Sequence, residues 1–185
     1  MSCFSPAVEA ETILVVPGWH NSAPGHWQSW FEEVVPHTAR VQQENWEQPQ
    51  LSVWAHPVRQ ALEQAAGPVW VVAHSFGCLA SVAATRRLPP SLRKKIRGAL
   101  LVAPADPARF QISAEALSET LPFPTRVVAS ANDPWVSLDT ARQWAGIWGS
   151  DFINVGTLGH INIDSGHGPW PDALAHFAAL RRKSA

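Results

Sequence analysis

Three residues with the chemistry of nucleophilic catalysis follow three separate apolar runs of this chain. Ser75 stands in residues 73–77 (AHSFG), Asp133 follows the run that ends at residue 130, and His160 follows the run that ends at residue 155. A serine hydroxyl is a weak nucleophile unless a base takes its proton, and an imidazole can do so near neutral pH. A carboxylate holds that imidazole in one tautomer and stabilises its charged form. These residue types, in this order, predict acyl-transfer chemistry.

Ser75 lies where a strand is expected to turn sharply into a helix. The apolar run 69–73 favours a buried strand, and residues 76–87 favour a helix. Such an elbow lifts the hydroxyl away from the sheet, and it needs small neighbours because the strand and helix backbones come close. Gly77 meets this need, whereas Ala73 stands at the position where glycine is usual. The alternative interpretation is a plain helix N-cap, a role in which serine is common.

Two other residues compete for the acid and base roles. Asp106 also follows an apolar run, and His167 lies in a glycine-rich loop before the last predicted helix. We favour Asp133 as the acid, because its strand comes directly before the strand that leads to the histidine. We favour His160 as the base, because it lies nearer to the end of its strand.

Residues 17–22 (PGWHNS) follow the first apolar run and suggest the second half of an oxyanion site. The backbone N–H of Trp19, or of His20, is expected to join that of Phe76 around a developing oxyanion. We expect His20 and Trp135 to line the substrate pocket, since ligand pockets are mostly apolar. The alternative interpretation is an ordinary glycine turn, with the tryptophans packed in the core.

Apolar, β-branched runs alternate with helical patterns along the whole chain. Strands are expected at residues 12–17, 40–43, 69–73, 98–103, 125–130 and 152–155, and helices at 26–35, 52–66, 76–87, 138–148 and 170–182. The proline-punctuated segment 104–124 is expected to be a loop with one short helix. This alternation favours a mostly parallel sheet of about six strands with helices on both faces, in a single α/β domain over residues 1–185. The chemistry should then gather at the carboxyl ends of the strands.

Composition excludes several other classes of protein. A net charge of −1 over 185 residues gives no bulk attraction to nucleic acid or to an anionic membrane. The two cysteines, Cys3 and Cys78, form neither a disulfide framework nor a metal cluster. No phosphate-binding glycine motif follows a strand, so we expect no cofactor and no metal. With no recognisable leader or membrane span, we expect a cytoplasmic protein; its oligomeric state is left open.

The chain resembles the small serine hydrolases related to retinoblastoma-binding protein 9, a family with many bacterial members. The resemblance runs from Ile13 to about Phe177 and rests on residues 17–22, 26–27, 73–77, 132–134, 159–162 and 165–171. It implies a compact α/β-hydrolase fold without a cap domain, a triad matching Ser75, Asp133 and His160, and an esterase-like activity. The motif Leu-x-Cys-x-Glu, which is associated with binding to the retinoblastoma protein, is missing, so that partner is not implied.

Two functions of different classes therefore remain open. The first is a serine hydrolase that cleaves a small acyl ester, or an amide or thioester, at a shallow and open site. The alternative is a non-catalytic binding protein on the same scaffold, because a fold does not fix a function. All three triad positions carry competent residue types, which favours the enzyme.

Overall fold

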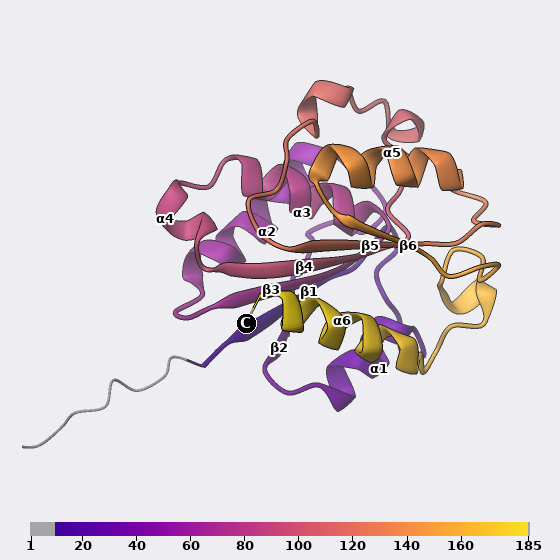
Figure 1. Cartoon of the computed structure of the whole chain (residues 1–185), viewed down its shortest axis with the longest axis horizontal. Coiled ribbons are helices and arrows are strands. Elements are labelled where there is room, and N and C mark those ends of the chain that lie inside the picture. The colour runs from indigo at the N-terminus through magenta and orange to yellow at the C-terminus, as the bar shows by residue number, and fades with distance from the viewer. Residues whose placement is uncertain (1–9, 185) are drawn as a thin grey trace, which may run out of the picture.

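Six short apolar runs pair into one parallel sheet in a computed structural model that describes residues 10–184 (Figure 1). The strands are β1 (Thr12–Val16), β2 (Thr38–Arg40), β3 (Val69–His74), β4 (Ile96–Val102), β5 (Thr125–Ala129) and β6 (Asp151–Asn154). Their order is β2-β1-β3-β4-β5-β6, and all neighbours are parallel. The predicted parallel sheet is thereby confirmed.

Helices cover both faces of this sheet. They are α1 (Trp27–Val34), α2 (Leu51–Gln64), α3 (Phe76–Arg86), α4 (Pro90–Arg93), α5 (Leu138–Trp148) and α6 (Pro171–Lys183), with 3₁₀ turns η1 (Pro107–Phe110), η2 (Ala114–Ala116) and η3 (Ile163–Ser165). Helices α1 and α6 lie on one face, and α2, α3 and α5 lie on the other (Figure 1). The connection from β4 to β5 holds only the turns η1 and η2, so within residues 10–184 no large cap domain is inserted over the sheet.

Strand β3 shows why a continuous apolar run suits the middle of such a sheet. All six of its residues are buried. Side chains alternate between the two faces of a strand, so Trp70 and Val72 pack in the core under α1 and α6. Val71 and Ala73 pack in the other core, under α2 and α3. Strand β3 therefore contributes to two hydrophobic cores at once.

The strand order reverses between β1 and β3, which places a crevice at their carboxyl ends. From β1 the chain moves outward to β2 on one side, and it then returns to β3 on the other side. In open parallel sheets ligands bind outside the carboxyl ends of the strands at this kind of switch point. Gly18 follows β1 and Ser75 follows β3, so the topology brings the two segments together.

The predicted strand at residues 40–43 is wrong in position, since β2 spans Thr38–Arg40. The pairing starts at Ile13 N–H, which donates to His37 O, and it ends at Val41 N–H, which donates to Val15 O. The register pairs Ile13–Val15 with Thr38–Arg40, and the chain leaves the sheet after Val41. The apolar Val41 is buried in the core, which explains why the pattern around it resembled a strand centre.

Other boundaries agree with the predicted ones to within two residues, and three local features are informative. Helix α2 begins at Leu51 with Gln50 as its N-cap, not at Ser52. The segment 104–124 contains two 3₁₀ turns where one short helix was expected. The single turn α4 was not predicted; it begins directly after Pro89, because Pro90 presets the backbone angle of a first helical residue.

Most of the tryptophans are in the core, as their size predicts. Trp27, Trp54, Trp70, Trp144, Trp148 and Trp170 are buried, whereas Trp19 and Trp135 are 36% and 42% exposed. Cys78 is buried and unpaired, and Cys3 lies outside the described residues. Within residues 10–184 no helix has the length and apolarity needed to cross a bilayer.

Candidate active site

Ser75 occupies a strained turn between β3 and α3. Its backbone has φ 52° and ψ −124°, a conformation that is rare for a residue with a side chain. The turn is anchored on both sides, since Ser75 N–H donates to Val102 O and Cys78 N–H donates to Ser75 O, each at 3.0 Å. Strain of this kind persists only where the surrounding structure fixes it, and it is typical of functional sites.

Two glycines allow the end of β1 to press against this turn. A Cβ atom on Gly77 would lie 2.4 Å from the carbonyl oxygens of Val16 and Pro17. One on Gly18 would lie 2.7 Å from the Cβ of Ser75. Both positions therefore exclude any side chain, whereas Ala73 is accommodated in the core under α2 and α3.

The side chains of Ser75, His160 and Asp133 form one hydrogen-bonded chain. The Nε2 of His160 lies 2.9 Å from Ser75 Oγ, and its Nδ1 lies 2.8 Å from Asp133 Oδ2. The side chains of His160 and Asp133 are only 8% and 1% exposed. The other carboxylate oxygen, Oδ1, accepts the N–H of Trp135 at 2.8 Å, which leaves Oδ2 directed at the imidazole.

The two loops that carry Asp133 and His160 are tied to each other by Ser130 and Asn132, two residues for which no role was predicted. Asn132 Oδ1 accepts the N–H of Gly159 at 2.7 Å, and Ser130 Oγ accepts the N–H of Leu158 at 2.9 Å. Ser130 Oγ also donates to Asn132 Oδ1 at 2.8 Å. Polar side chains directly after a buried strand are the signal that could have identified this pair, since such positions lie at the edge where sites form.

The two competing residues have other roles. The carboxylate of Asp106 accepts the N–H of Ala108 and so caps the turn η1. The Nδ1 of His167 lies 3.1 Å from Ser165 Oγ, and its carbonyl accepts the N–H of Trp27. Neither side chain is hydrogen-bonded to Ser75 or to His160, so the structure brings together Asp133 and His160 as the sequence order indicated.

The backbone N–H groups of Trp19 and Phe76 have no acceptor among residues 10–184. Phe76 is the first residue of α3, where N–H groups are left without partners inside the helix. Trp19 follows Gly18, which is pressed against Ser75. Two N–H groups without an acceptor therefore belong to residues close to Ser75, and the partial positive charge of the helix N-terminus reinforces the second.

A buried side chain holds the loop after β1 from behind. Gln28 Nε2 donates to Val16 O at 3.3 Å and to Val72 O at 3.1 Å, so it bridges the ends of β1 and β3. Its Oε1 accepts the hydroxyl of Ser22 at 2.6 Å. Gln28 falls within the helix expected at residues 26–35, but nothing in the spacing of residue types predicts this contact.

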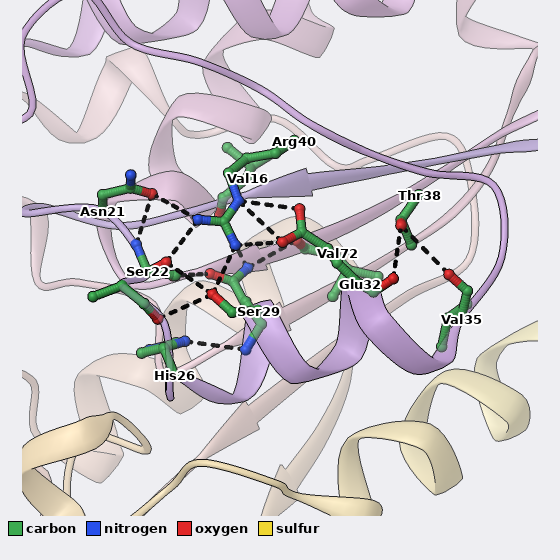
Figure 2. Close-up of polar contacts among 12 residues, drawn as sticks. Val16, Asn21, Ser22, His26, Ser29, Glu32, Val35, Thr38, Arg40 and Val72 are labelled. Carbon is green, nitrogen blue, oxygen red and sulfur yellow. Dashed lines mark hydrogen bonds and ion pairs between the residues drawn. The ribbon is translucent and has the colours of Figure 1, made fainter.

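Arg40 completes this network from the edge strand, as Figure 2 shows. Its Nη1 donates to Ser22 O at 2.6 Å and to Asn21 Oδ1 at 3.2 Å. Its Nε lies 3.1 Å from both carboxylate oxygens of Glu32 on α1. Because both side chains of this ion pair are at most one-fifth exposed, the pair fixes the loop between β1 and α1 more firmly than a surface pair would.

Burial lowers the pKa of two histidines near this site. The pKa of His26, which caps α1 by accepting the N–H of Gln28, falls to about 4, chiefly through burial and then through the charge of Arg40. Burial also lowers the pKa of His167. Burial raises the pKa of the Cys78 thiol well above its usual range, so this thiol stays protonated and is a poor nucleophile.

Ser75 and His160 open onto a small aromatic cleft of about 120 Å³. Its other walls include Trp19, His20, Arg109, Phe110, Trp135 and Asp164. The ring of Trp19 stacks on His20 at 4.5 Å and meets Phe110 and Trp135 edge to face at 6.1 and 6.3 Å. A larger cleft, of about 740 Å³, lies over α2 and α3 and contains none of the residues of the triad.

Comparisons with known proteins agree with this arrangement. The family model of serine hydrolases matches residues 13–179. The structure described as a YdeN-like hydrolase from Pectobacterium atrosepticum is 37% identical and has a TM-score of 0.86, over 94% of this chain and 92% of that one. Among curated proteins, none matches the chain significantly.

Two more distant structures share the fold. The ydeN gene product of B. subtilis is 19% identical with a TM-score of 0.77, over 92% of this chain and 98% of that one. Esterase 2 of Thermogutta terrifontis is 13% identical with a TM-score of 0.68, over 98% of this chain and 86% of that one. The extent of the family match and the identity to the YdeN-like hydrolase lead to one conclusion: this chain belongs to the serine hydrolase family.

Proposed function

We propose that the protein is a carboxylic-ester hydrolase that acts through Ser75, His160 and Asp133 and a covalent acyl-enzyme. The observation that carries the proposal is the unbroken chain of hydrogen bonds from Ser75 Oγ through both ring nitrogens of His160 to Asp133 Oδ2. Membership in the serine hydrolase family supports the same chemistry.

In the first half of the reaction Ser75 Oγ attacks the carbonyl carbon of the ester. Its proton passes to His160 Nε2, which lies 2.9 Å away. The Nδ1–H of His160 donates to Asp133, whose negative charge stabilises the imidazolium that forms. The same proton then goes to the departing alkoxide, which leaves as an alcohol while the acyl group stays on Ser75.

The negative charge that develops on the carbonyl oxygen needs hydrogen-bond donors fixed in advance. The unpaired N–H groups of Trp19 and Phe76 supply two, and the close approach of Gly18 to Ser75 sets the first near the reacting carbon. Loss of a single donor of this kind typically costs about 10²–10³-fold in rate.

In the second half of the reaction a water molecule releases the acyl group. His160 Nε2 takes a proton from that water, which attacks the acyl carbon and forms a second tetrahedral intermediate held by the same N–H groups. Collapse of this intermediate returns the proton to Ser75 Oγ and frees a carboxylic acid. The shallow position of the cleft, with no cap domain above it, gives water direct access.

The dimensions of the cleft favour short acyl groups. A space of about 120 Å³ is small for a ligand site, and its aromatic walls favour apolar groups. Trp19 and Trp135 are among the few exposed large apolar side chains of residues 10–184, and both face this space. We therefore propose esters of short, apolar acids as substrates, with His20 and Trp135 as pocket residues.

Hydrolysis of p-nitrophenyl esters of increasing acyl length tests this proposal. We expect the specificity constant kcat/KM to be highest for acetate or butyrate and to fall for octanoate. Ser75→Ala should abolish turnover, whereas Ser91→Ala, which changes an exposed serine on α4, should leave it unchanged. Equal rates for wild type and Ser75→Ala would reject the enzyme and favour a binding protein on a hydrolase scaffold.

A further inference from the structure

The residue directly before Ser75 places a second imidazole behind the proposed base. His74 is the last residue of β3, and its side chain points to the same face of the sheet as those of Trp70 and Val72. It is only 4% exposed and is surrounded by the cores of α1 and α6. A polar side chain at such a depth needs a hydrogen-bond partner.

That partner is the backbone of His160. His74 Nε2 lies 2.9 Å from His160 O, and a carbonyl oxygen can only accept, so this nitrogen carries the proton. The centres of the two rings are 5.0 Å apart. His74, which directly precedes Ser75, therefore holds the backbone of His160. His160 lies 85 positions after Ser75 in the sequence and must reach its hydroxyl.

The backbone at His160 is where the loop most needs to be held. The next residue, Ile161, has φ 49°, a value that is unfavourable for a β-branched side chain. Gly159 on the other side has φ 60° and is fixed through Asn132. The backbone has a positive φ on both sides of His160. Such a conformation relaxes unless contacts on either side hold it.

His74 can do this without opposing the charge of the reaction. Its ring lies 4.9 Å from that of His26 on the side of α1. Burial holds the pKa of both histidines below the ordinary range, for His26 at about 4. The ring of His74 is therefore neutral near pH 7, and no second positive charge stands behind the imidazolium that forms on His160.

We infer that His74 is a positioning residue, which acts through the carbonyl of His160 to hold the imidazole at hydrogen-bonding distance from both Ser75 and Asp133. It touches neither substrate nor a reacting atom. His74 has this role only if Ser75 and His160 act as proposed above. A base displaced by about 1 Å can lower a rate about a hundredfold, so the effect is measurable.

The test compares His74→Leu, which removes the donor, with His74→Gln, whose amide nitrogen can reach the same carbonyl. With p-nitrophenyl butyrate, His74→Leu should lower kcat by about tenfold to a hundredfold with KM little changed, because ground-state binding in the cleft is unaffected. His74→Gln should restore most of kcat. His176→Phe, which removes a half-buried histidine on α6, should change neither value.

The folded fraction of each variant is measured by circular dichroism and thermal unfolding. If His74→Leu does not fold, His74→Asn replaces it, since its shorter amide stops before the carbonyl. Wild-type kcat in the folded Leu or Asn variant, equal loss in the Gln variant, or a loss confined to KM would each overturn the role of His74. If wild type itself showed no turnover that depends on Ser75 and His160, the proposed function would fail first.

Discussion

The loop after β1 and the loop after β6 both reach Ser75, but they are held in different ways. The first carries Trp19 and is fixed by Gln28 and Arg40, whose polar groups are buried or nearly so. The second carries His160; Ser130 and Asn132 tie it to the end of β5, and the buried His74 donates to the backbone of His160. The contacts of the first loop also join β1 to β3, so they belong to the fold as much as to the site.

This difference predicts that some substitutions will mainly lower the catalytic rate and that others will mainly lower the stability of the fold. Changes of the triad residues His160 and Asp133 should lower the rate of the reaction far more than they lower the free energy of unfolding. Changes behind the loop after β1 should lower the free energy of unfolding, because they leave buried polar groups without partners. The predictions below test this separation, from the largest effect to the smallest.

The largest effect is expected from His160→Ala. Removal of the base should lower kcat for p-nitrophenyl butyrate by about 10⁵-fold or more, as loss of a triad base does in other serine hydrolases. The matched variant His167→Ala, in the same loop region, should keep its activity. A larger loss in His167→Ala than in His160→Ala would show that the base is assigned to the wrong histidine.

Asp133→Asn should have the next largest effect. An amide in place of Asp133 favours the wrong tautomer of His160 and gives no charge to stabilise the imidazolium, so kcat should fall by about 10⁴-fold. Asp106→Asn serves as the control and should retain wild-type kcat, since Asp106 only caps η1. Steady-state kinetics on both variants decide between the two acids, and the reverse order of losses would contradict the assignment.

Gln28→Leu tests the other loop. It leaves Val16 O, Val72 O and the hydroxyl of Ser22 without their partner. At about 1–3 kcal/mol for each of these three buried groups, we expect the free energy of unfolding to fall by about 3 kcal/mol or more in urea titrations. Gln60→Leu, at an exposed position of α2, provides the matched control. A stable Gln28→Leu protein would mean that this network does not hold the fold.

The smallest effect is a pH dependence of stability on the side of α1. The pKa of His26 is about 4 when folded and about 6.5 when exposed, so the unfolded chain binds more protons between these values. The contribution of neutral His26 to the free energy of unfolding is therefore complete above pH 6.5. It is lost as the pH falls toward 4, and its size is on the order of 3 kcal/mol. His26→Gln should flatten the rise in stability with pH in that window, whereas His56→Gln, on the exposed side of α2, should not. Identical pH profiles for wild type and His26→Gln would contradict this.

The sequence predicted the residues at the strand ends better than the contacts behind them. The apolar runs before Ser75, Asp133 and His160 fixed three strands, and parallel strands must end at one edge, so the three side chains could be expected to meet. His74 and Gln28 gave no such signal, because each resembles an ordinary member of a strand or helix pattern. Their partners lie 86 and 44 positions away, and the contacts depend on the path of the loop after β6 and on the packing of α1 against the sheet.

Local geometry explains the remaining differences. The position of β2 depends on its register with β1, which periodicity alone does not define. Ala73 could be tolerated upstream of Ser75 because the close approach of β1 falls at Gly77 and Gly18 instead. These distances follow from the three-dimensional arrangement and not from the spacing of residue types.

Covalent labelling by a fluorophosphonate tests the central claim most directly, since this probe reacts only with a serine whose hydroxyl is activated. Intact-mass and peptide mass spectrometry of the folded protein should find one adduct, on Ser75, and labelling should be lost in Ser75→Ala and strongly slowed in His160→Ala. Ser91→Ala should label as wild type does. No adduct on folded wild-type protein, or equal labelling of Ser75→Ala, would contradict the account of Ser75 as the nucleophile.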